Sequence, residues 1–192
     1  MAFQTIPYRI ILASKSPRRQ DLLKKLGIKF EIKTKDIAEI YPPHLKREEV
    51  AVFLSELKAS AFANELNKND LVITSDNIVC MGGEIIGKPT DREDAIKMLC
   101  KLSGKKHKVI TAVTLLSQEK KHTFYEVTEV YFKPLTTPEI IYYIDNYQPY
   151  DKAGSYGIQE WIGYIGIEKI VGSYFNVMGL PVKRVYEELM AF

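Results

Sequence analysis

The residues best suited to chemistry lie where a short apolar run, Ile10–Ala13, gives way to the polar stretch Ser14–Arg19. Ser16 suits a helix N-cap, Pro17 suits the first helical turn, and Gly27 suits the helix end. The N–H groups at a helix start attract anions, and arginine can hold phosphate oxygens through two N–H groups at once. This stretch therefore predicts a phosphate site, but a capped helix with surface arginines would produce the same pattern.

Two further stretches carry candidate chemistry. Asp76 directly follows an apolar strand predicted at 71–75. The carboxyl ends of strands in α/β sheets often hold ligands, although a turn aspartate that bonds its own loop is an equal alternative. Residues 151–159 combine Asp151, Lys152, two glycines and Gln159. They form either a surface loop or part of a metal–phosphate centre in which the Gln159 amide reads a base edge.

Several other chemistries are excluded by the sequence. Residues 82–89 match the Gly-x-x-x-x-Gly-Lys part of a P-loop, but the last position is Pro89, which offers neither a hydroxyl nor an N–H group. Lys88 remains a candidate phosphate ligand as a point charge. The three histidines are not paired at ligand spacing, and there is no Gly-x-Ser-x-Gly turn, so zinc and covalent catalysis are disfavoured.

What remains is a set of acids and bases that suits magnesium-dependent phosphate chemistry, because carboxylates hold the cation and basic groups hold the phosphates. The acids are Glu39, Asp76 and Asp151, and the bases are Arg18, Arg19, Lys58, Lys88 and Lys152.

The composition is that of an ordinary globular protein of 192 residues, with 46% hydrophobic residues and a net charge of +3. This charge is too small to indicate nucleic-acid binding. No apolar run approaches the roughly 18 residues that a membrane span needs, and the short run after Arg9 is not a signal peptide. Cys80 and Cys100 show no metal or disulfide spacing, so we expect a reduced, cytoplasmic setting.

Strand and helix patterns alternate along the chain, which predicts an α/β fold with a mixed sheet. The expected strands are 10–13, 28–34, 71–75 (with an extended continuation over 77–80), 84–86, 109–116 and 124–132, with a strand pair within 161–170. The expected helices are 17–26, 47–66, 91–102, 137–147 and 181–190. Gly82-Gly83 marks a hairpin, and the paired prolines Pro42 and Pro43 mark an irregular loop.

Six segments, in this order, resemble the Maf family of nucleoside triphosphate pyrophosphatases. They are Leu12-Ala13-Ser14-x-Ser16-Pro17-Arg18-Arg19, Lys58-Ala59 with Ser75-Asp76-Asn77, Gly87-Lys88-Pro89, Gly104-x-x-His107-x-Val109-x-Thr111, Asp151-Lys152-Ala153-Gly154-x-Tyr156-Gly157-Ile158-Gln159, and Gly172-Ser173-Tyr174-x-x-Val177-x-Gly179-Leu180-Pro181. The resemblance covers nearly the whole chain. It implies a single Maf-like nucleotide pyrophosphatase domain over residues 1–192, with a two-lobed, ITPase-like α/β fold. In that fold a long twisted mixed sheet is flanked by helices, and the active-site cleft lies between the lobes.

The resemblance also implies hydrolysis of a nucleoside triphosphate to the monophosphate and pyrophosphate, with a divalent cation (Mg, Mn or Co) as cofactor. The form of residues 151–159 resembles the branch that acts on dTTP and UTP, which extends the expectation to modified pyrimidine nucleotides. A cytoplasmic protein, often a homodimer, is implied, with a nucleotide as its partner and neither nucleic acid nor a membrane.

Carried over by position, Asp76 matches the catalytic acid that activates water. Ser14, Arg18, Arg19, Lys58 and Lys88 match the phosphate-binding set, and Glu39 joins Asp76 near the metal. Arg18, Asn77 and Gln159 match positions that select the substrate.

The chain departs from the family pattern at two positions that bear on the nucleobase. Asn77 stands where threonine is usual, and Glu160 stands where glycine is common. The alternative substrates are therefore 7-methyl-GTP or another non-standard nucleotide. A second alternative, suggested by the family's historical name of septum formation inhibitor, is a nucleotide-binding regulator of cell division. A third is a nucleic-acid-binding module, which the small net charge disfavours.

Overall fold

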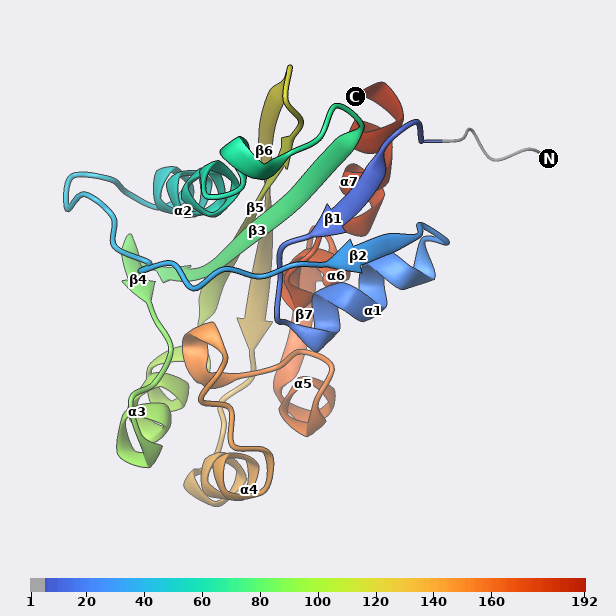
Figure 1. The fold of residues 1–192 in the computed structure, drawn as a ribbon. Helices are drawn as coiled ribbons and strands as arrows, with labels where there is room; N and C mark the ends of the chain where they lie inside the picture. Colours follow the sequence, from blue (N-terminus) through green and yellow to red (C-terminus); the bar gives the residue numbers. More distant parts are fainter. Residues whose placement is uncertain (1–5) are drawn as a thin grey trace. The chain divides into compact units, whose positions relative to one another are not determined.

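A computed structural model describes residues 6–192. Within these residues helices flank a mixed seven-stranded sheet, which confirms the predicted α/β class (Figure 1). Six strands follow the order β2-β1-β3-β5-β6-β7, and β4 pairs with β3. β1 is parallel to β2 and β3, whereas β4 and β7 are antiparallel to their partners. The strands are β1 Arg9–Leu12, β2 Phe30–Ile32, β3 Asp70–Met81, β4 Glu84–Ile86, β5 Lys106–Leu116, β6 Lys121–Phe132 and β7 Ile167–Val171.

The helices of this described part are α1 Pro17–Lys25, α2 Glu48–Ser60, α3 Arg92–Leu102, α4 Thr137–Tyr147, α5 Trp161–Gly166, α6 Tyr174–Met178 and α7 Val182–Ala191, with short 3₁₀ turns η1 Ala63–Glu65 and η2 Ala153–Ser155. Among residues 6–192, none of the helices has the length and hydrophobicity that a membrane span requires.

The chain divides into two compact units, in agreement with the two-lobed expectation. The first comprises the described residues up to 76, together with 111–126 and 179–192, and the second comprises 77–110 and 127–178. β3, β5 and β6 therefore contribute residues to both units. That residues 1–192 form one Maf-like domain stays a prediction.

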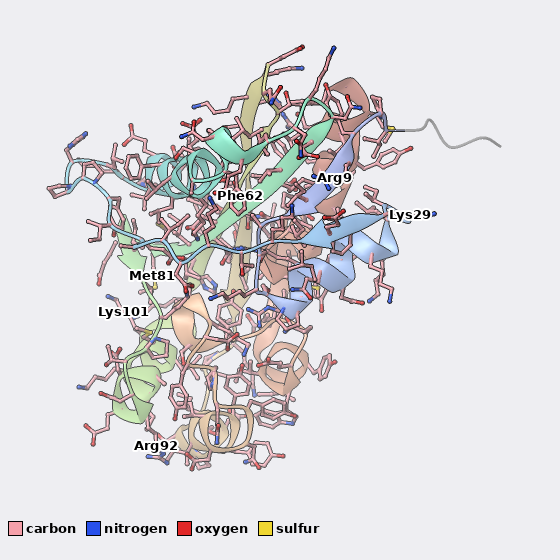
Figure 2. The ribbon with its side chains drawn as sticks, in the orientation of Figure 1. Arg9, Lys29, Phe62, Met81, Arg92 and Lys101 are labelled. Carbon is pink, nitrogen blue, oxygen red and sulfur yellow. The ribbon has the colours of Figure 1, made fainter. Side chains whose placement is uncertain are left out.

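In the first unit, β1 is a buried strand between β2 and β3, and α1 begins at Pro17, directly after its N-cap residue Ser16, as predicted. Arg9, labelled in Figure 2, donates from Nε and Nη2 to the two carboxylate oxygens of Asp70 at 2.7 and 2.8 Å. Phe62, which follows α2 and is also labelled, belongs to a buried cluster with Ile11 and Val72. These contacts fix the strand that leads into the predicted phosphate site.

In the second unit, α3 and α4 pack against each other and against the sheet residues of one large core (Figure 1). Leu99 of α3 and Tyr143 of α4 are fully buried in that core. α4 begins with a capping box, in which Thr136 and Glu139 each bond the other's backbone N–H, so its start agrees with the prediction.

The strand pair expected within 161–170 is wrong. Residues 161–166 form α5, and only 167–171 form a strand, β7. The aromatic and β-branched residues there favoured strands, but Gly163 allows a helical turn to lie against the preceding chain. A Cβ at Gly163 would be 1.8 Å from the carbonyl oxygen of Ile158. Short-range propensity is therefore overridden by a close backbone approach that only glycine permits.

His107, near the start of β5, is a buried ionisable group whose environment affects stability against acid. It is 1% exposed, stacks on Phe132, and its Nε2 is 2.7 Å from the Tyr156 hydroxyl. Burial lowers the pKa of His107 from 6.5 to about 4. The folded protein therefore holds a neutral imidazole where the unfolded chain would bind a proton.

We predict that this histidine makes the protein less stable in acid. The contribution of the neutral His107 to the free energy of unfolding is fully present above pH 6.5 and is lost as the pH falls toward 4. At pH 5 this loss amounts to about 2 kcal/mol. Urea unfolding of His107→Gln should show a smaller loss between pH 7.5 and pH 5 than the parent. Tyr156→Phe, which keeps the imidazole, should retain the parent's pH dependence. Equal losses in His107→Gln and the parent would contradict the prediction.

Candidate active site

Lys58 lies between two carboxylates in the first unit. Its Nζ is 2.5 Å from Oδ1 of Asp76 and 2.7 Å from Oε1 of Glu39. The side chains of Asp76 and Lys58 are 8% and 18% exposed, whereas that of Glu39 is 44% exposed. Both acids meet the same ammonium group, so the structure brings together three of the predicted site residues at one place.

Buried hydroxyls hold α2 against the sheet one helical turn before Lys58. Ser55 Oγ is 2.9 Å from Thr114 Oγ1, and the Thr74 hydroxyl donates to the Ser55 carbonyl at 2.7 Å. All three residues are fully buried. Thr74 and Asp76 are two residues apart on β3 and therefore face the same side of the sheet. The contact between Ser55 and Thr74 thus sets the register in which Lys58 meets Asp76.

Glu39 lies in the irregular segment between β2 and α2, which the paired prolines predicted. Lys35 fastens the start of this segment to the residues after α2. Its Nζ donates to the Ala61 carbonyl at 2.6 Å and to Glu65 Oε1 at 2.5 Å, and lies 4.9 Å from the centroid of the Phe62 ring. Nothing in the sequence distinguished Lys35 from a solvated loop lysine, so its anchoring role was missed.

The turn from β1 into α1 contains Ser14, Ser16 and Arg18, as predicted, but the hydrogen bonds of the two serines differ from those of a capped helix start. Ser16 is the N-cap residue, but its side chain makes no capping bond. Instead, Ser14 Oγ accepts the Ser16 N–H at 3.2 Å, and the Ser14 carbonyl accepts from Gln20 Nε2 at 3.0 Å. A serine hydroxyl that accepts one hydrogen bond can also donate one, so this contact is compatible with phosphate binding by Ser14. Arg18 is half-buried in the first turn of α1.

Arg19 is committed to backbone oxygens within the first unit. Its Nε donates to the Gly179 carbonyl at 2.8 Å, and its Nη1 donates to the Ser75 carbonyl at 2.7 Å. Burial lowers the pKa of the Arg19 guanidinium, whereas the carboxylates of Asp76 and Glu39 raise it. A guanidinium stays protonated in proteins. Arg19 therefore braces the residue before Asp76 and also places a fixed positive charge near it.

The two carboxylates around Lys58 fit a hard divalent cation. No group of three or more histidine, cysteine or acidic side chains within residues 6–192 could hold a metal ion. Magnesium is commonly bound by only one or two carboxylates together with substrate phosphates and water. Glu39 and Asp76 supply that number of hard oxygen ligands, and they already share one cationic group.

In the second unit, the segment carrying Lys88 is tied to the segment carrying Gln159. The Gly154 N–H donates to the Gly87 carbonyl at 2.9 Å, one residue before Lys88. Lys88 is exposed, Gln159 is half-buried, and Asn77 is half-buried in β3. Side-chain alternation along β3 directs Asn77 away from the face that carries Asp76.

Lys152, for which the sequence left open a surface loop or a metal–phosphate centre, is paired within its own loop. Its side chain is only 9% exposed, and its Nζ is 2.6 Å from Asp151 and 3.2 Å from Glu160. Glu160 in turn accepts the Tyr143 hydroxyl. The sequence did not predict this cluster, because Tyr143 lies on α4 and only the fold brings it to the loop.

This chain is similar to known proteins over nearly its whole length. Residues 9–192 match the family model described as Maf-like protein. The chain is 55% identical to a protein of Phocaeicola vulgatus named dTTP/UTP pyrophosphatase, over 95% of both chains. A protein of Flavobacterium johnsoniae with the same name is 52% identical over 95% of this chain and 94% of its own.

Among solved structures, the Staphylococcus aureus Ham1 protein is similar over 65% of this chain and 71% of its own, with 19% identity and a TM-score of 0.46. The match over residues 9–192 and the identity to full-length relatives agree with the six motifs read from the sequence. The chain belongs to the Maf family.

Proposed function

We propose that this protein hydrolyses dTTP and UTP, and modified pyrimidine nucleoside triphosphates of the same shape, to the monophosphate and pyrophosphate. The relatives that it resembles over nearly their whole length carry the name dTTP/UTP pyrophosphatase. The observation that carries the proposal is the contact of Lys58 with both Asp76 and Glu39. It combines a proton acceptor, a phosphate-binding cation and a pair of metal ligands at one place.

In this mechanism Asp76 orients a water molecule and accepts its proton as the water oxygen attacks the α-phosphorus. The bond from the α-phosphorus to its bridging oxygen then breaks, and pyrophosphate leaves. Lys58 and Ser14 hold phosphate oxygens, with Arg18, Arg19 and Lys88 completing the set. Because the phosphates carry several negative charges, these groups lower the barrier chiefly by electrostatic stabilisation.

Glu39 and Asp76 would hold the divalent cation, with Mg, Mn and Co as the candidates. When bound, such an ion neutralises phosphate charge and makes bound water easier to deprotonate. The chain's own contribution is to keep two carboxylates directed at one place, and to exclude solvent from Asp76.

Base selection is assigned to Arg18, Asn77 and Gln159. We further propose a cytoplasmic enzyme acting on free nucleotide, apart from nucleic acid and membranes, with a homodimer as the assembly to examine. The single Maf-like domain over residues 1–192 belongs to the same proposal.

The substrate proposal is tested by a panel of canonical and modified nucleoside triphosphates, including 7-methyl-GTP, with Mg²⁺, Mn²⁺ or Co²⁺ and pyrophosphate as the readout. We expect dTTP and UTP to give the highest kcat/KM and pyrophosphate to form in equal amount to the monophosphate. A preference for 7-methyl-GTP, or release of single phosphates, would contradict the proposal.

Replacing the proposed base should remove catalysis while leaving the fold intact. Asp76→Asn keeps the shape of the side chain but cannot accept the proton, so we expect kcat to fall by at least about 10²-fold. Asp36→Asn is the matched control, because Asp36 is a 92% exposed acid in the loop that carries Glu39. It should retain parental kinetics. Circular dichroism and urea unfolding verify the fold, and near-parental turnover in Asp76→Asn would refute the assigned role.

The metal assignment has a readout that does not depend on activity. Lys58 contacts both Glu39 and Asp76, so Lys58→Met should remove a positive charge that competes with Mn²⁺ for these carboxylates and should tighten Mn²⁺ binding in the absence of nucleotide. We expect about a tenfold lower Kd, equivalent to about 1.4 kcal/mol, by isothermal titration calorimetry. Glu39→Gln combined with Lys58→Met should abolish that gain. Unchanged or weaker Mn²⁺ binding in Lys58→Met would show that the cation binds elsewhere.

A further inference from the structure

Glu160 is held on both of its carboxylate oxygens. Oε2 accepts the hydroxyl of Tyr143, and Oε1 lies 3.2 Å from Nζ of Lys152. The Glu160 side chain is 19% exposed and that of Lys152 is 9% exposed. Charges this far removed from water persist only when they are paired and hydrogen-bonded. Lys152 also contacts Asp151 at 2.6 Å. Ion pairs therefore join Asp151, Lys152 and Glu160, and a hydrogen bond joins Tyr143 to Glu160.

The same cluster grips the backbone at Gly157. The Gly157 N–H donates to the Tyr143 hydroxyl at 3.0 Å. A Cβ at Gly157 would lie 2.7 Å from the carboxylate carbon of Glu160, so that carboxylate packs directly on the glycine. Tyr143 therefore receives a hydrogen bond from one end of the Gly157–Glu160 segment and donates one to the other.

These bonds close a four-residue turn that contains Gln159. The Glu160 N–H donates to the Gly157 carbonyl at 3.0 Å, and the Glu160 carbonyl accepts from Gly163 at 2.8 Å at the start of α5. Gln159 is the third residue of the turn, so the direction of its side chain depends on how rigidly the two ends are held. A glycine at position 160 would supply only the backbone bond.

We propose that Glu160, together with Tyr143 and Lys152, is a positioning residue that fixes Gln159 and thereby sets the nucleobase preference. This inference rests on the proposed function and on the role of Gln159 in it. The carboxylate does not contact the substrate. It acts by restricting the turn, which favours one hydrogen-bonding edge of the base over others because a fixed amide rejects a mismatched edge more strongly than a mobile one.

The first test compares kcat/KM for dTTP, UTP and CTP in the parent and three variants. Glu160→Gly removes both side-chain contacts, Tyr143→Phe removes the hydrogen bond, and Glu160→Gln keeps an acceptor for Tyr143 while losing the charge. We expect the preference for dTTP and UTP over CTP to fall about tenfold in Glu160→Gly and Tyr143→Phe, and by less in Glu160→Gln. Glu168→Gln, at an exposed acid of β7, should change nothing.

The second test asks whether Glu160 acts through Gln159. In a Gln159→Ala background, Glu160→Gly should produce no further change in the preference ratio, because the side chain that it positions is already absent. Equal losses for all three nucleotides in Glu160→Gly, or a full additional change in the Gln159→Ala background, would overturn the proposal and leave Glu160 with a structural role only.

A binding measurement separates this inference from the proposed function. Trp161 is the single tryptophan of the chain and directly follows Glu160, and its ring lies 4.7 Å from that of Tyr142. Its fluorescence can follow binding of each nucleotide in EDTA, where a metal-dependent reaction does not proceed. If the nucleotides bind in EDTA but are not hydrolysed when a divalent cation is added, the proposed function is refuted. The ratios of the Kd values would then still test the positioning role. An unchanged Kd ratio in Glu160→Gly would refute that role alone, and absence of binding would refute both.

Discussion

The sharing of one lysine by two carboxylates is the interaction on which the first unit depends. Asp76 is almost fully buried, and an isolated buried carboxylate is costly. Lys58 offsets that cost and also draws in Glu39 from a segment without regular structure. The buried hydroxyls under α2 and the Lys35 anchor then have a common effect, since each fixes one of the charged partners relative to the others.

The second unit also contains a lysine that contacts two carboxylates. For this lysine, Lys152, both carboxylates come from its own loop, and one is further held by Tyr143. The difference has a physical consequence. The acids around Lys58 come from two separate segments, the irregular loop before α2 and strand β3, whereas the Glu160 carboxylate packs directly on the backbone at Gly157. The first cluster suits chemistry and the second suits positioning.

Local signals in the sequence predicted the parts of the fold that local chemistry controls. Pro17 at the start of α1, the Gly82-Gly83 hairpin and the threonine cap of α4 all behave as expected, because caps and turns need only neighbouring residues. The α5 segment was misread because its helical turn depends on Gly163 lying against the Ile158 carbonyl. The motifs identified Lys58 and Asp76, but their contact depends on the packing of α2 on β3.

Arg19 shows why residue type alone could not settle the phosphate set. A backbone carbonyl and a phosphate oxygen accept the same guanidinium hydrogen bonds, so a sequence cannot distinguish an arginine that binds one from an arginine that binds the other. Here two of its N–H groups hold the Ser75 and Gly179 carbonyls. Hydrogen bonds to neutral carbonyls leave the positive charge in place, and burial reduces its screening by water. Arg19 can therefore attract phosphate as a fixed charge while bracing the middle of β3, where Asp76 lies within the strand and not at the strand end that the sequence predicted.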